Sequence, residues 1–195
     1  MDTFRYLVRF LYRIRWYLAT MPLIALVVAF LSTRNMEHNY DTNTTIYTGM
    51  ITSYNIEGGS GAAGGNPQAN INNLMLIIST DNTIHEVSLR LFARCMMYGN
   101  PNRDNNYISA EHFRQLNESV PTDVKALINR NSETATYANL KAYEKPMQSN
   151  YVFGILNYHP YFGIDNITSR LKVSQLSGSD IINISYSAND AGVAY

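Results

Sequence analysis

The sequence predicts an α+β protein that an N-terminal transmembrane helix anchors in a membrane, with several helices packed on a small mixed β-sheet. Three observations lead to this prediction. A basic tip precedes an uncharged run of 17 residues, Trp16–Ser32. Apolar residues at helical spacing dominate the middle of the chain. Strand-like segments lie on both sides of that middle, so the first strand is expected to pair with the last ones.

The composition is that of an ordinary folded domain. Only 15% of the 195 residues are charged and 15 are tyrosines, which argues against disorder and against a coiled-coil rod. Basic and acidic residues balance at 15 each, so the charge indicates no nucleic-acid-binding surface. Cys95, the single cysteine, is expected to be a small buried hydrophobe.

The N-terminal segment is expected to form a basic cytoplasmic tip, residues 1–15, and a transmembrane helix, residues 16–33. At about 1.5 Å per residue, the uncharged run covers roughly 25 Å. A cleaved signal peptide is the alternative, but Leu31-Ser32-Thr33 is a poor cleavage site. The residues expected to anchor the helix at the membrane surfaces are aromatic or basic: Arg13, Arg15, Trp16, Tyr17 and Arg34.

A strand is predicted over Thr44–Ile56, and a glycine-rich piece follows it. Residues Gly59–Gly64 match the dinucleotide fingerprint G-x-G-x-x-G. Its context does not fit, because Gly65, Asn66 and Pro67 extend the loop where a nucleotide site needs a helix to begin. The segment is therefore interpreted as a flexible loop.

The middle of the chain is predicted to be helical. One helix is expected from Ile71 to Ile78 and a second from Ile84 to Met96, with a break at Ser79–Asn82 and a stop at Gly99. Shorter helices are expected at five places: from Ser109, from Pro121, over Tyr137–Tyr143, over Val152–Leu156 and over Ile167–Leu171.

Two strands are predicted near the end of the chain, Leu171–Val173 and Asp180–Tyr186. Alternation places three core-strand residues on one face of the second strand: Ile182, Ile184 and Tyr186. Asn189 and Asp190 look like the cap of another helix, yet the chain ends at Tyr195. That ending suggests an incomplete reading frame or a fragment.

No pattern of catalytic residues appears. The histidines His38, His85, His112 and His159 lack a metal-ligand spacing and are each expected at the surface. No nucleophile motif and no phosphate-binding lysine motif occur either, so the chain is expected to be no enzyme and to need no metal or cofactor.

One aromatic segment has the groups that bind sugars, which are ring faces beside hydrogen-bonding side chains. The alternative is that these rings pack the helices against the sheet. The candidate glycan contacts are Asn157, Tyr158, His159, Tyr161 and Phe162.

The order of basic tip, apolar run, Thr-rich strand, helical middle and final strands resembles the Wzz-type polysaccharide chain-length determinants, also called polysaccharide co-polymerases. The likeness lies in Leu171-x-Val173, Ser179–Tyr186 and Asn189-Asp190. Further segments, Tyr40–Thr42 with Thr45–Gly49, and Gly154–Tyr158, resemble the branch found in Bacteroidetes exopolysaccharide loci. Family members usually have proline where this chain has Ala191, and they continue into a long helix and a second membrane span.

The resemblance implies a non-enzymatic scaffold that regulates chain length in exopolysaccharide or lipopolysaccharide O-antigen biosynthesis. It also implies a place in the bacterial inner membrane, with residues 34–195 in the periplasm. The implied partners are further copies of the chain in a homo-oligomer, a polysaccharide polymerase, the growing polysaccharide and an outer-membrane export channel, but no nucleic acid.

Two other functions stay open from the residues alone. The chain would fit the inner-membrane component of a polysaccharide export complex, because the same superfamily performs both tasks. A membrane-anchored sensor or solute-binding ectodomain is the second alternative, although fifteen residues before the apolar run leave no cytoplasmic output domain.

Overall fold

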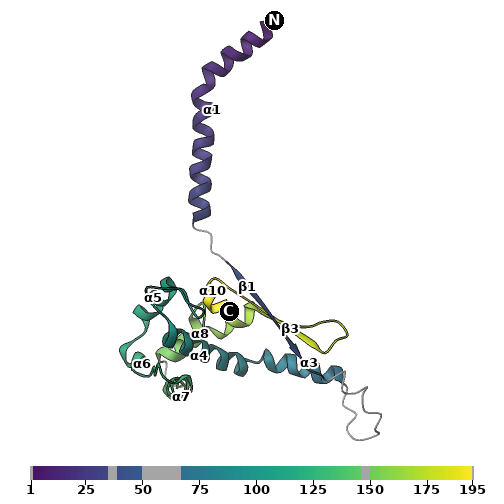
Figure 1. The fold of residues 1–195 in the computed structure, drawn as a ribbon, viewed down its shortest axis with the longest axis vertical. Coiled ribbons are helices and arrows are strands. Elements are labelled where there is room, and N and C mark those ends of the chain that lie inside the picture. Colours follow the sequence, from purple (N-terminus) through teal and green to yellow (C-terminus); the bar gives the residue numbers. More distant parts are fainter. Residues whose placement is uncertain (1, 35–38, 50–66, 146–149, 195) are drawn as a thin grey trace. The chain divides into compact units, whose positions relative to one another are not determined.

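The computed structural model describes residues 2–34, 39–49, 67–145 and 150–194. The chain divides into two compact units, Met1–His38 and Asn39–Tyr195. The described residues of the first unit form one helix, α1 (Asp2–Arg34), so the basic tip and the uncharged run belong to one continuous element (Figure 1).

The predicted transmembrane helix over residues 16–33 is wrong. Within the described residues, no helix has an apolar stretch long enough to cross a membrane. Thr20 and Pro22 interrupt the uncharged run, so its unbroken apolar part, Leu23–Leu31, has nine residues. Nine helical residues cover about 14 Å of a hydrocarbon layer roughly 30 Å thick.

The second unit contains a three-stranded sheet in the order β1-β3-β2, formed by Tyr40–Tyr47, Ile181–Ala188 and Leu171–Gln175. The prediction that the first strand pairs with strands from the end is confirmed: the register runs from Tyr40 opposite Ala188 to Tyr47 opposite Ile181. The predicted mixed sheet is wrong, because both strand pairs are antiparallel. A tight loop with Gly178 at φ +68° joins β2 to β3 as a hairpin.

Strand β1 begins four residues before the predicted start at Thr44. Its pairing with β3 ends at Tyr47, after which the Thr48 backbone N–H donates to the Asp180 carbonyl at 2.9 Å. Residues 50–56 of the predicted strand lie outside the described residues, as does the glycine-rich fingerprint Gly59–Gly64.

The helices of the second unit follow the predicted breaks. The stop at Gly99 is confirmed, since Gly99 caps α4, and the break at Ser79–Asn82 separates α3 from α4. Asp190 caps a short C-terminal helix, as its sequence position suggested. The helices are α3 (Pro67–Ile78), α4 (Asp81–Tyr98), α5 (Ala110–Ser119), α6 (Thr122–Ala126), α7 (Glu133–Tyr143), α8 (Tyr151–Tyr158), α9 (Ile164–Arg170) and α10 (Ala191–Ala194).

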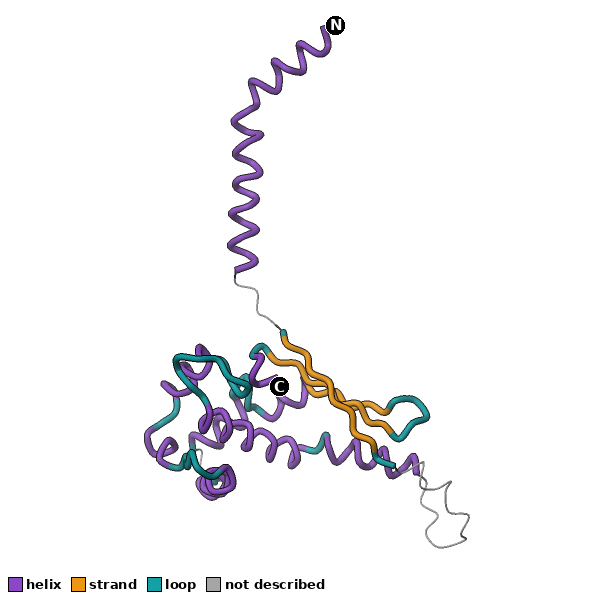
Figure 2. The backbone as a smooth tube through the Cα atoms, in the orientation of Figure 1, coloured by secondary structure: helices purple, strands orange, loops and turns teal. Residues whose placement is uncertain are grey.

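The hydrophobic core lies around α4, against which α5, α7, α8 and α9 pack (Figure 1). Helices α3 and α9 contact β2, and α10 contacts β1 and β3, so the sheet joins the same core at one end (Figure 2). The largest fully buried side chains include Phe92, Leu89, Leu140, Leu156, Phe162 and Ile182. This packing brings the end of β3 against the start of α5.

Candidate functional site

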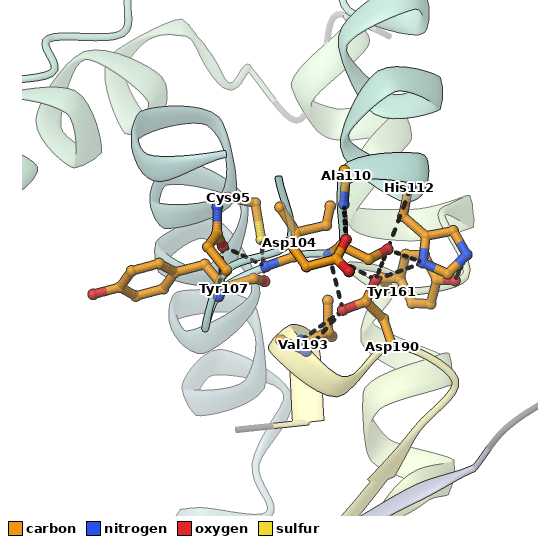
Figure 3. Close-up of polar contacts among 12 residues, drawn as sticks. Cys95, Asp104, Tyr107, Ala110, His112, Tyr161, Asp190 and Val193 are labelled. Carbon is orange, nitrogen blue, oxygen red and sulfur yellow. Dashed lines mark hydrogen bonds and ion pairs between the residues drawn. The ribbon is translucent and has the colours of Figure 1, made fainter. Parts of the chain in front are cut away.

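A buried carboxylate, Asp190, organises the point where β3 ends (Figure 3). Its Oδ2 accepts hydrogen bonds from the Ser109 hydroxyl at 2.6 Å and from His112 Nδ1 at 2.5 Å. Its Oδ1 accepts from the backbone N–H groups of Gly192 at 2.8 Å and Val193 at 3.2 Å. One side chain therefore links β3, α5 and α10.

The network continues through His112 to Tyr161. The Tyr161 hydroxyl lies 3.0 Å from His112 Nε2, and the two rings are tilted by 57° at a centroid distance of 5.1 Å. An ionised Asp190 can only accept, so His112 Nδ1 carries the proton of their hydrogen bond, and Nε2 and the Tyr161 hydroxyl form the next bond of the network. Tyr161 precedes α9, so the network also ties the α8–α9 connection to α5.

The pKa of Asp190 reflects two opposing effects. Burial of the carboxylate raises its pKa, whereas hydrogen bonds from the side chains of Ser109 and His112 and from backbone N–H groups lower it. The net pKa lies below the usual value for an aspartate, so Asp190 is ionised at neutral pH.

Serine, histidine and aspartate also form hydrolytic triads, but this geometry differs from a triad. In a triad the aspartate binds one ring nitrogen and the serine the other. Here Ser109 lies 3.0 Å from Nδ1, the nitrogen that Asp190 also binds, and its hydroxyl donates to Asp190. Tyr161 occupies Nε2, so the arrangement serves as a cross-link between elements rather than as a means of activating Ser109.

The candidate glycan residues occupy different environments. Tyr158 is 82% exposed, whereas Phe162 is fully buried and packs edge to face against Phe92. The His159 ring stacks on Phe162 at a centroid distance of 4.7 Å. Asn157 donates to the Phe153 carbonyl inside α8. The structure brings the His159, Tyr161 and Phe162 rings together and leaves Tyr158 apart from them.

The remaining predicted residues are placed as follows. Ile182 is fully buried in the central strand, while Ile184 and Tyr186 on the same face are half-buried. Arg13, Trp16 and Tyr17 are exposed on α1. The side chains of Arg15 and Arg34 lie outside the described residues, although both residues belong to α1.

Three of the histidines that were expected at the surface rather than in a metal site are partly exposed. His112 and His159 are half-buried in the contacts above, and His85 Nε2 lies 2.7 Å from the Glu144 carboxylate. Each ring makes a polar contact with another residue, and this contact reduces the free-energy cost of burying the ring. His38 lies outside the described residues.

Cys95 is buried, as predicted. Burial raises the pKa of its thiol well above the usual value, and the nearby charge of Asp190 raises it further. The Sγ atom lies 3.3 Å from the Tyr107 carbonyl (Figure 3). The thiol is therefore a packing group in this structure. Among the described residues, no group of three acidic, histidine or cysteine side chains could hold a metal ion.

Sequence reasoning missed the network itself. The sequence predicts Ser109 as a helix start and Asp190 as a cap, but the two residues are 81 positions apart, so the sequence does not indicate their contact.

Comparison of the chain with family models, with curated proteins and with solved structures gives no match in any of the three.

Gly192 allows α10 to approach the loop before α5, and we expect its substitution to be destabilising. A Cβ at this position would lie 2.3 Å from the Ile108 backbone nitrogen, so Gly192→Ala forces backbone to move. We expect a loss of about 1–3 kcal/mol in the free energy of unfolding, measured with urea.

Gly154→Ala is the matched control for this prediction. Gly154 lies inside α8 with no atom within 4 Å of the added methyl group. Because alanine stabilises a helix relative to glycine, the control should gain up to about 1 kcal/mol. Equal effects of the two substitutions would contradict the close approach at Gly192.

The half-buried His159 predicts a loss of stability in mild acid. Burial lowers the pKa of this imidazole to about 4, and its Nδ1 accepts from the Tyr161 backbone N–H. The unfolded chain takes up a proton near pH 6.5 while the folded protein does not, so stability falls as the pH drops from that value toward 4. For a partly exposed ring we expect on the order of 1 kcal/mol.

The measurement is the urea midpoint of the wild type and of His159→Gln at pH 7 and pH 5. Glutamine keeps an acceptor for the Tyr161 N–H but does not titrate. The variant should therefore lose less stability between the two pH values than the wild type. An identical loss in both proteins would assign the acid sensitivity to other groups.

Proposed function

We propose that this chain is a non-enzymatic scaffold of the Wzz type, which regulates the chain length of a bacterial surface polysaccharide. It would act as a homo-oligomer beside the polymerase and the growing polymer, on the periplasmic side of the inner membrane. The proposal starts from the segments of the sequence that resemble this family.

The observation that carries the proposal is the pairing of β1 with β3. Both strands contribute to the resemblance, with Tyr40–Thr42 and Thr45–Tyr47 in β1 and Ile181–Tyr186 in β3. They are more than 130 residues apart, yet they pair in a continuous antiparallel register. A resemblance produced by chance would not require these two segments to be neighbours in space.

The Asp190 network adds a second line of support. Its side chains are used to join β3 to α5, α10 and the α8–α9 connection, and Tyr161 and Asp190 occupy both nitrogens of the His112 ring. A rigid junction of this kind suits a protein whose task is to present surfaces to partners. Asp190 also stands in the Asn189-Asp190 pair that contributes to the family resemblance.

The test is the length distribution of surface polysaccharide, separated on a gel, in cells that carry or lack the complete gene. Deletion should replace a defined modal band by a broad spread, and the wild-type gene should restore the band. Polymer of unchanged length that accumulates inside the cell would favour the export component instead. An unchanged length and location of the polymer would overturn the proposal.

A further inference from the structure

The loop between α4 and α5 forms a hollow of about 400 Å³, which we call the loop pocket. It is lined by Tyr98, Asn100 and residues 103–107. Its volume is typical of small-molecule sites. The pocket lies outside the segment 157–162 in which glycan contacts were expected.

The loop pocket is held in shape by its own hydrogen bonds. The Asn105 amide donates to the Tyr98 carbonyl at 2.9 Å and accepts from the Tyr107 N–H at 2.8 Å. The Asp104 carboxylate accepts from the Ala110 N–H at 2.7 Å, which fixes the loop to the start of α5 (Figure 3). A site built in this way loses little conformational entropy when a ligand binds.

Two aromatic rings form one wall of the pocket. Tyr98 and Tyr107 stack with their centroids 4.7 Å apart and their planes at 23°. Figure 3 shows the Tyr107 ring directed away from His112 and Asp190, so the stack belongs to the pocket and not to the buried network. Tyr98 is 43% exposed, which leaves aromatic surface accessible.

Polar side chains around the rings remain available to a ligand. Arg103 and Asn106 are exposed, and neither side chain bonds to another residue in the described part of the chain. The charges of Arg103 and Asp104 cancel, which disfavours phosphate and other anions. The lining contains no aliphatic side chain.

We propose that the loop pocket binds a neutral pyranose unit of a polysaccharide. The apolar face of a sugar ring packs on an aromatic wall, and its hydroxyl groups pair with amide, guanidinium and carboxylate groups of the kinds that surround this wall. The choice of ligand rests on the proposed function; the location of the site does not.

The experiment measures binding of oligosaccharides, released by mild hydrolysis from the surface polysaccharide of the cells that carry the gene, to the full-length protein. Saturation-transfer NMR reports contact, and titration gives the dissociation constant. Arg103→Ala and Asn106→Ala should each weaken binding about tenfold, because each removes a ligand hydrogen bond without removing a contact within the protein. Tyr98→Leu should weaken it at least as much.

Two controls locate the site. Arg130→Ala removes an exposed arginine from a different loop, and Tyr158→Ala removes the most exposed ring of the 157–162 segment. Both should bind as the wild type does. If Tyr158→Ala abolishes binding and Arg103→Ala does not, the glycan site lies in that segment and the loop pocket is overturned.

The failure of this inference is distinguishable from the failure of the proposed function. A wild-type protein that binds no oligosaccharide overturns the loop pocket, even where deletion of the gene changes the polymer length. Binding that is lost in Arg103→Ala establishes the site, even where deletion leaves the polymer unchanged and chain-length control is wrong.

Discussion

Ile182→Asp should prevent the second unit from folding. Ile182 is fully buried in β3, the central strand, and pairs with Ile46 on one side and Gln175 on the other. An aspartate at this position must either desolvate a charge or take up a proton and leave polar atoms without partners. The expected cost is about 4 kcal/mol or more, which is comparable with the whole stability of a small domain.

Asn183→Asp is the matched control, since it adds the same charge one residue further along the same strand. Asn183 is half-buried on the opposite face of the sheet, where its side chain faces Ser185. We expect a change within about 1 kcal/mol there, measured by urea unfolding followed by circular dichroism. A folded and equally stable Ile182→Asp protein would show that this face of β3 is not part of the core.

The central strand could be predicted because the sequence alternates clearly at one place. Ile182, Ile184 and Tyr186 alternate with polar residues, which identifies β3 and its inward face. The antiparallel direction of all strands was not predictable in the same way, since it depends on the short turn at Gly178. The absence of charges over residues 16–33 favours a membrane helix, but Thr20 and Pro22 limit the unbroken apolar part to Leu23–Leu31, which is too short to cross a membrane.

The candidate site was predicted only in parts. A cap such as Ser109 or Asp190 has a local signal, because the side chain bonds to a backbone within three residues. The contact between the two caps has none, since it depends on how α10 packs against the loop before α5. The contacts of His112 also have no local sequence signal, because Asp190 is distant in sequence and Tyr161 follows a different helix. Periodicity identifies faces of elements but not which polar groups meet between them.

Asp190→Ala should destabilise the second unit by about 3–5 kcal/mol. The substitution leaves the His112 Nδ1–H and the Ser109 hydroxyl without their buried acceptor, and it removes the cap of α10. A buried donor that is left without an acceptor costs about 1–3 kcal/mol, and the loss of the helix cap adds about 1 kcal/mol. The measurement is urea unfolding at pH 7, with Asp165→Ala, an exposed aspartate, as the control expected within about 1 kcal/mol.

Asp190→Asn removes the negative charge but keeps an acceptor that can cap α10. The amide oxygen can still accept from Gly192 and Val193, but its NH₂ group faces donors at Ser109 and His112, so an intermediate loss is expected. The carboxylate stabilises the fold only while it is ionised. Since its pKa is lowered in the folded protein, its contribution is complete above the usual aspartate pKa and is lost as the pH falls through the folded value.

The stability difference between the wild type and Asp190→Asn should therefore be constant from pH 7 to about pH 5 and then shrink in stronger acid. A stability difference that does not change with pH would mean that the charge of Asp190 contributes nothing to the stability of the fold. The carboxyl group would then act only through its shape and its hydrogen bonds to α10. In that case the helix cap would stabilise the fold, and the contacts with His112 and Tyr161 would be a consequence of the cap.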